Sequence, residues 1–119
     1  MFNTIGFIGT GTMGAAVARA VVKGAPGASI LLSNRTPAKA EALAKDLGVQ
    51  ASDNETVART CSLIFLGVKP QMMAGMLESI APILAARSDR FVLASMAAGL
   101  DAQRIQAMAG GKYPVICFM

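Results

Sequence analysis

The stretch GFIGTGTMG, residues 6–14, decides the fold of this chain. Its residues 9–14 have the G-x-G-x-x-G spacing, which indicates dinucleotide binding only when a strand precedes it and a helix follows. Residues 4–9 are apolar and partly β-branched, which favours a strand, and residues 12–23 show helical periodicity. The motif therefore predicts a strand–loop–helix unit that presents backbone amides to a diphosphate. The alternative is a turn with a purely structural role.

Downstream of this unit the chain continues to alternate between apolar strands and amphipathic helices. Strands that are apolar throughout are typical of a parallel sheet covered on both faces, and right-handed crossovers then predict a doubly wound α/β sheet of the Rossmann type. The length of 119 residues suits one domain, so we expect residues 1–119 to form a dinucleotide-binding domain. The expected strands are 4–9, 29–33, 48–52, 62–68, 91–95 and 114–119, and the expected helices are 12–23, 37–47, 54–60, 71–85 and 101–108.

Two of the expected helices carry apolar stripes. Helix 12–23 is expected to bury a face made of Met13, Ala16, Val17, Ala20 and Val21. Helix 71–85 carries an apolar patch, expected in the core or at a domain interface, made of Met72, Met73 and Met76.

Composition and charge exclude several classes of function. The net charge of +4 permits anionic ligands, but the basic residues are scattered and aromatic residues make up 5% of the chain, so no nucleic-acid partner is expected. The chain has no His, and Cys61 and Cys117 are far apart, which argues against a metal site. Both cysteines lie in apolar runs and are expected to be buried thiols in the cytoplasm. With no signal-peptide pattern and no bilayer-spanning stretch, no membrane association is expected.

The segment SNRT, residues 33–36, predicts which dinucleotide binds. It follows the second strand, where NAD-binding proteins place an acidic residue on the ribose, and here that position holds neutral Asn34 beside cationic Arg35. A carboxylate 4 Å from a 2′-phosphate charge would cost about 4 kcal/mol at an effective dielectric of 20. Its absence, with a guanidinium in its place, predicts that NADPH is preferred over NADH. The alternative is that Arg35 is simply solvated.

Two more segments end strands at the edge where open α/β sheets bind ligands. In GVKPQ, residues 67–71, Lys69 is expected near the phosphates or riboses of the cofactor, unless it is merely exposed. In SMAAG, residues 95–99, small side chains would let a flat nicotinamide lie against the backbone, unless they serve only tight packing.

In this order and spacing, the segments FIGTGTMG, SNRT, NETV, GVKPQ and AAG resemble the N-terminal domain of the pyrroline-5-carboxylate reductase family over the whole chain. The resemblance implies reduction of the cyclic imine 1-pyrroline-5-carboxylate to L-proline with NADP as cofactor. The cofactor contacts that it implies are Ile8, Gly9, Thr10, Gly11, Thr12, Met13, Ser33, Asn34, Arg35, Thr36, Asn54, Val68, Lys69, Pro70, Met96, Ala97 and Ala98.

Departures from the family pattern limit what the resemblance implies. Gly67 replaces a usual Ala, a mild change, and Cys117 and Phe118 stand where an Arg often precedes a further loop. We expect that the family's C-terminal helical domain, which makes the homo-oligomer and much of the substrate site, is missing from this chain. We therefore expect a truncated chain that is inactive alone and supplies the cofactor half of the site, with no catalytic residue assigned.

Two alternatives stay open. One is an NADP-dependent oxidoreductase similar to the β-hydroxyacid dehydrogenases, which share the G-x-G-x-M-G opening. The other is a non-catalytic NADP-binding module.

Overall fold

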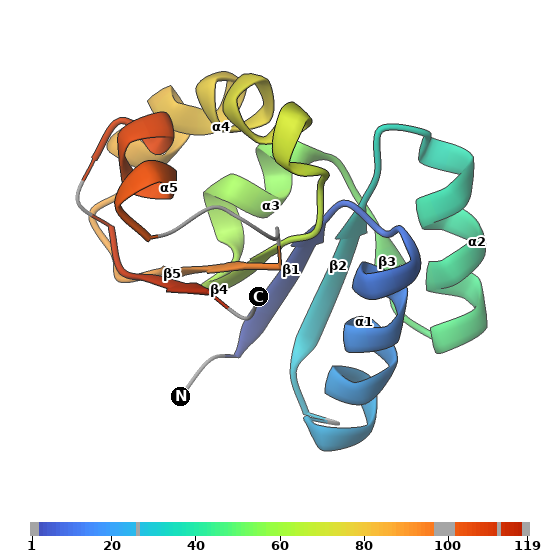
Figure 1. The fold of residues 1–119 in the computed structure, drawn as a ribbon. Coiled ribbons are helices and arrows are strands. Elements are labelled where there is room, and N and C mark those ends of the chain that lie inside the picture. The colour runs from blue at the N-terminus through green and yellow to red at the C-terminus, as the bar shows by residue number, and fades with distance from the viewer. Residues whose placement is uncertain (1–2, 26, 97–101, 112, 118–119) are drawn as a thin grey trace.

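A computed structural model describes residues 3–25, 27–96, 102–111 and 113–117. Within these residues the strands are β1 (Thr4–Ile8), β2 (Ser29–Ser33), β3 (Gln50–Ala51), β4 (Leu63–Leu66), β5 (Val92–Ser95) and β6 (Val115–Cys117). The helices are α1 (Thr12–Gly24), α2 (Pro37–Leu47), α3 (Asn54–Thr60), α4 (Pro70–Ala85) and α5 (Ala102–Ala109). The strands form one sheet in the order β3-β2-β1-β4-β5-β6, and every pairing is parallel (Figure 1). The predicted doubly wound fold is confirmed.

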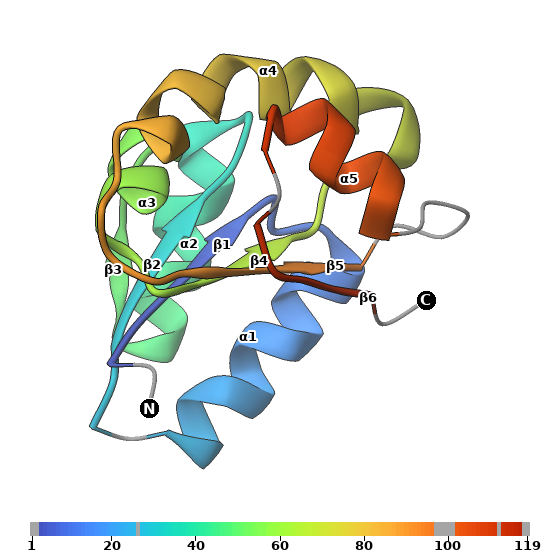
Figure 2. The ribbon, with the colours of Figure 1, turned by 90° about the vertical axis from the view of Figure 1, so that its left-hand side faces the viewer.

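Helices cover both faces of the sheet, which is why its strands are apolar throughout. Figure 2 shows α4 and α5 on one side of the sheet and α1 on the other. Alternate residues of β1 enter the two cores, because successive side chains of a strand point to opposite faces. Ile8 packs with α3, α4 and α5, whereas Phe7 packs with α1 and α2 and stacks on Phe65 at a centroid distance of 4.6 Å.

Helix α2 begins and ends where its sequence predicts. Pro37 occupies the first turn, and Gly48 ends the helix in the left-handed region at φ 73°. Glycine is the residue that adopts this conformation without steric cost, so these two residues bound the helix locally.

The predicted buried face of α1 is partly wrong. Ala16 and Ala20 are exposed, while Gly14 and Ala18 are buried against the sheet and Val17 and Val21 are half-buried. The apolar periodicity of α1 was compatible with both faces, because alanines and valines occupy almost its whole circumference. The packed side carries Gly14 and Ala18, whose small size lets the helix approach the strands closely, with Val17 and Val21 beside them.

Two further predictions are corrected. Cys117 is exposed, not buried, because β6 is an edge strand of the sheet, and the neighbouring Ile116 is likewise 49% exposed. The methionines of α4 do not form one patch: Met73 is fully buried, whereas Met72 is 40% exposed. Cys61 is buried as predicted, and burial raises the pKa of its thiol.

Two kinds of feature are absent from the described residues. No helix there is both long enough and apolar enough to cross a membrane. In the same part of the chain, no group of three or more His, Cys, Asp or Glu side chains is placed to hold a metal ion.

Candidate functional site

The candidate site lies where the carboxyl ends of β1, β2 and β4 meet. Two backbone hydrogen bonds join the loops at this point: Gly9 N donates to Ser33 O at 2.8 Å, and Gly67 N donates to Ile8 O at 2.8 Å. From β1 the chain continues to β2 and β3 on one side of the sheet, and after β3 it crosses to β4 on the other side of β1, so this is the switch point of the sheet. Open α/β sheets bind ligands in the crevice at such a point.

The three glycines of the loop have different surroundings. Gly9 has φ 95°, and a Cβ there would lie 2.7 Å from the carbonyl carbon of Gly67. A Cβ on Gly14 would lie 2.5 Å from the carbonyl oxygen of Gly9. A Cβ on Gly11 would meet nothing within 4 Å. The first and third glycines therefore permit close packing, and the second leaves open space beside the backbone.

Gly67 is more constrained than the sequence pattern suggested. A Cβ at this position would lie 2.6 Å from Gly9 O and 3.0 Å from Met96 Cε. The loops after β1 and β4 therefore touch at Gly67, and a larger residue there would require one of the loops to shift.

A cleft of about 670 Å³ opens over these strand ends. Its charged side chains, among the described residues, are Arg35 and Lys69, so its charge favours an anionic ligand. The predicted site residues that line it are Ile8, Gly9, Gly11, Asn34, Arg35, Asn54, Val68 and Lys69.

A second cavity of about 500 Å³ adjoins the cleft and shares Asn34, Arg35 and Asn54 with it. Its wall also includes Asp53 and Glu55, so the charge of this cavity is mixed. Asp53 caps α3 by accepting a hydrogen bond from Thr56 N at 2.7 Å. That bond, with help from the Thr56 side chain, holds the pKa of Asp53 below its ordinary value.

Polar contacts order the wall shared by the two cavities. Ser33 Oγ donates a hydrogen bond to Asn54 Oδ1, which joins the end of β2 to the start of α3. Asn34 Oδ1 accepts from the backbone amide of Arg35 at 3.0 Å, which shapes the turn into α2. The segments 33–36 and 54–57 are thus held together although they lie far apart in the sequence.

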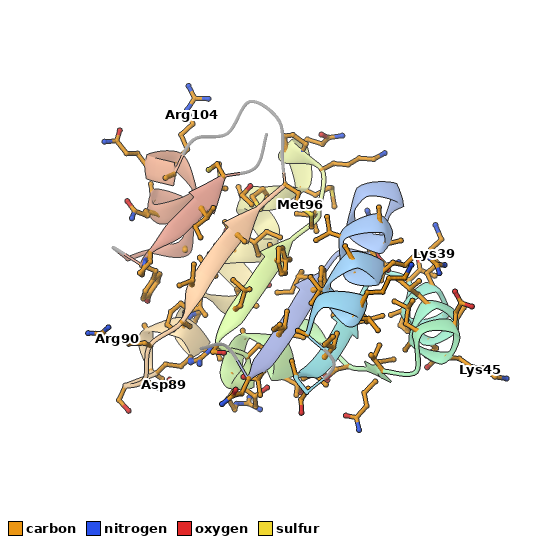
Figure 3. The ribbon with its side chains drawn as sticks, turned by 90° about the horizontal axis from the view of Figure 1, so that it is seen from below. Lys39, Lys45, Asp89, Arg90, Met96 and Arg104 are labelled. Carbon is orange, nitrogen blue, oxygen red and sulfur yellow. The ribbon has the colours of Figure 1, made fainter. Side chains whose placement is uncertain are left out.

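The structure does not place every predicted site residue on the cleft wall. Thr10 is buried under the loop, Met96 is 7% exposed at the end of β5, and Thr36 and Pro70 are exposed at the first turns of α2 and α4. Figure 3 shows Met96 at one end of β5 and Asp89 at the other. Ala97, Ala98 and the side chains of Thr12 and Met13 lie outside the described part of the structure.

Sequence reasoning missed one wall of the cleft. It is formed by one face of α4, with Gln71, Met72, Gly75 and Met76. The signal was available in the helical period, because the opposite face carries Met73, Leu77, Ile80 and Leu84, all buried. The buried stripe already accounts for the core contact of α4, so the additional methionines beside it indicate a second contact surface on the same helix.

The start of α1 fits the diphosphate of a dinucleotide. Its N-cap is Gly11, which offers no side chain to the amides of the first turn, and that turn holds no acidic residue. Unpaired amides and the positive end of the helix dipole favour an anion at this point. The open space beside Gly11 would let that anion reach the backbone.

No His, Tyr, Cys, Asp or Glu side chain lines the cleft within the described residues. Tyr113 contacts the ring of Phe91 at 4.8 Å between centroids. Tyr113 precedes β6 and Phe91 precedes β5, so both lie at the amino ends of these strands. The cleft lies at the opposite, carboxyl ends. This arrangement gives Tyr113 a packing role.

The chain is similar to one described oxidoreductase family and to several pyrroline-5-carboxylate reductases. The model of the family described as NADP oxidoreductase, coenzyme F420-dependent, matches residues 4–99. A pyrroline-5-carboxylate reductase of Vibrio alginolyticus is 32% identical over 117 residues, which are 97% of this chain and 42% of that protein. The chain thus spans about two fifths of the length of the curated relatives it matches.

Solved structures show the same fold. A pyrroline-5-carboxylate reductase from Coxiella burnetii superposes with a TM-score of 0.85 at 24% identity, over 98% of this chain and 43% of that one. A pyrroline carboxylate reductase from Plasmodium falciparum, solved with NADP bound, gives a TM-score of 0.76 at 25% identity, over 96% of this chain and 40% of that one.

Proposed function

The chain belongs to the NADP oxidoreductase, coenzyme F420-dependent, family, and from this premise we propose that it forms the NADP-binding part of a pyrroline-5-carboxylate reductase. The observation that carries the proposal is the cleft at the switch point, where the open backbone at Gly11 and the cations Arg35 and Lys69 line one cavity. The choice of pyrroline-5-carboxylate as substrate rests on the names of the relatives, of which the chain covers about two fifths.

In this proposal the diphosphate lies against residues 9–14, at the start of α1. The adenosine side extends along the end of β2, where Arg35 and Asn34 border both cavities. Arg35 would pair with a 2′-phosphate, because the planar guanidinium group can donate two parallel hydrogen bonds to phosphate oxygens. This is the basis for a preference for NADPH over NADH. The nicotinamide side would run toward Met96, Ala97 and Ala98.

The chain's own residues bind and orient rather than react. When bound, NADPH supplies the hydride that a protonated cyclic imine accepts. The loops after β1, β2 and β4 hold the cofactor in one position, which favours close contact between the nicotinamide and the imine carbon. Since no proton donor is assigned, the imine would arrive protonated. The homo-oligomer and a substrate site formed largely by a further domain remain predictions from the resemblance. The cytoplasmic location remains a prediction from the cysteines and from the lack of a signal-peptide pattern.

The cofactor assignment is tested by Arg35→Ala, with Lys39→Ala as the matched control. Both variants remove one exposed cation, but Lys39 lies on α2 and borders neither cavity (Figure 3). A hydrogen bond to a charged group contributes about 1.5–3 kcal/mol, so Arg35→Ala should weaken NADPH binding about 10- to 100-fold in a fluorescence titration. NADH binding should change less than about threefold, as should both affinities in Lys39→Ala. An equal loss for both cofactors would refute the role of Arg35.

The reaction is tested by turnover of the full-length gene product. NADPH oxidation is followed with 1-pyrroline-5-carboxylate in one assay and with a 3-oxo acid in another. We expect NADPH to be oxidised only in the assay that contains the imine. Turnover of the oxo acid alone would identify a dehydrogenase of another specificity, and NADPH binding without turnover of either would identify a binding module.

A further inference from the structure

Thr10 has a buried hydroxyl group without a partner. The residue is 8% exposed, its Oγ1 atom is inaccessible to solvent, and no hydrogen bond to it is found within the described residues. Buried side-chain oxygens nearly always have a hydrogen-bond partner, so this one needs an explanation. Ser33 at the end of β2 is also buried, but its hydroxyl has a partner, because it donates a hydrogen bond to Asn54 Oδ1.

The surrounding backbone prevents Thr10 from moving to the surface, where water could supply the missing hydrogen bond. Gly9, before it, is held by its hydrogen bond to Ser33 O and by its close contact with Gly67. Gly11, after it, is the N-cap of α1, and Ala15 N bonds to Gly11 O at 2.8 Å. Thr10 is also β-branched, which restricts its side chain to few rotamers. The backbone of Thr10 is therefore held at the start of the helix, and only rotation of the side chain can bring its hydroxyl to a partner.

The position of Thr10 indicates what could satisfy it. Gly9 and Gly11 both line the cleft, so the residue between them lies directly behind the cleft wall. The adjacent first turn of α1 presents amide donors, and these attract an acceptor rather than another donor. A hydroxyl can donate to the same acceptor after rotation between staggered χ1 positions. A diphosphate oxygen is an acceptor of this kind.

We propose that the hydroxyl of Thr10 is reserved for the bound dinucleotide and donates a hydrogen bond to a diphosphate oxygen. This inference rests on the proposed function. Without the ligand the hydroxyl is buried and unpaired, which destabilises the chain, and with the ligand it is paired. Thr10 is thus a positioning residue that binds the cofactor through its side chain at the expense of the stability of the ligand-free form.

The test is Thr10→Val, which keeps the shape of the side chain and removes the hydroxyl. If the hydroxyl is unpaired without ligand, the melting temperature of the ligand-free chain should rise by about 4 °C or more. The dissociation constant of NADPH should increase about tenfold, because the new hydrogen bond is lost. Opposite signs of the two effects are the signature of the proposal.

Two controls accompany this variant. Thr10→Ser retains the hydroxyl and should bind NADPH within about threefold of the original chain, without a gain in melting temperature. Thr60→Val removes a hydroxyl that donates to Thr56 O at 2.8 Å, on an exposed residue that borders neither cavity. It should lower the melting temperature or leave it unchanged, and leave NADPH affinity unchanged, which excludes a general stabilisation by valine.

The possible failures are distinguishable. A lower melting temperature in ligand-free Thr10→Val would show that the hydroxyl has a partner there, which overturns the proposal. So would a higher melting temperature with unchanged NADPH affinity, because the cofactor would then not use the hydroxyl. If the original chain bound neither NADPH nor NADH, the proposed function itself would fail, whereas the other two outcomes leave it intact.

Discussion

The glycine loop offers a paired experiment in which two chemically identical substitutions should have different consequences. Gly14→Ala adds a methyl group 2.5 Å from Gly9 O and 3.3 Å from Gly9 C. Both are backbone atoms of a turn held by the bond from Gly9 N to Ser33 O, so they cannot rotate away as a flexible side chain would. Ordinary contact begins at 3.4 Å, and the start of α1 must therefore shift by about 0.9 Å relative to the loop.

The energetic cost follows from two opposing effects. Overpacking by one methyl group costs about 1–3 kcal/mol, while alanine within a helix regains about 0.5–1 kcal/mol relative to glycine. The net loss for Gly14→Ala is about 0.5–2 kcal/mol, or about 2–8 °C in melting temperature for a chain of this size.

Gly11→Ala is the matched partner. Its φ of −71° suits alanine, and the added methyl group meets nothing within 4 Å. Alanine is a poor N-cap, at a cost of up to about 1 kcal/mol, but it restricts the unfolded chain by a similar amount, so the melting temperature should change by less than about 2 °C. The methyl group would, however, occupy the space that the diphosphate needs, and NADPH affinity should fall at least about tenfold.

Thermal denaturation followed by circular dichroism, together with an NADPH titration, separates the two effects. Gly14→Ala should primarily lose stability, and Gly11→Ala should lose affinity at unchanged stability. The reasoning is refuted if Gly14→Ala melts at the original temperature, or if Gly11→Ala binds NADPH as tightly as the original chain.

Further predictions concern the ion pair of Arg87 and Asp89 and the two thiols. Arg87→Met should lower the free energy of unfolding in urea by about 2–4 kcal/mol, because the buried guanidinium donates to the carbonyls of Ala58 and Cys61, which would lose their donor. Arg87 also holds the pKa of Asp89 below its ordinary 3.8, so this carboxylate stabilises the fold above that pH and the stabilisation is lost as pH falls through the lowered pKa. In melting curves from pH 2 to 6, Asp89→Asn should therefore show a shallower acid-side decline, and an unchanged decline would contradict this. With a thiol reagent under native conditions, Cys117 should react quickly and Cys61 only after denaturant is added, and rapid labelling of both would show that the helices over Cys61 open readily.

Local sequence determined much of the fold because its signals act over short distances. The glycine spacing of residues 9–14, the apolar strands and the Pro37 and Gly48 boundaries of α2 each reflect a backbone or burial requirement of neighbouring residues. Most element boundaries differed from prediction by one or two residues. The same local signals identified the loops after β1, β2 and β4, which the structure brings to one cleft.

Other features depend on which elements pack together, and local patterns do not contain that information. Helix α1 is apolar almost all round, so its sequence does not indicate which side is buried. The buried side carries Gly14 and Ala18, because these small residues let the helix lie close to the sheet. Cys117 lies in an apolar run yet is exposed, since its strand is at the sheet edge.

The sequence by itself thus determined the order of strands and helices and a glycine-rich loop between the first two of them. Tertiary structure alone decided that α4 contributes a wall to the cleft, that Asp53 and Glu55 line one cavity with Arg35, and that the hydroxyl of Thr10 is left without a partner. The reason is physical: periodicity and turn chemistry are properties of adjacent residues, whereas burial, charge proximity and hydrogen-bond satisfaction are set by segments that are distant in the chain and adjacent in the fold.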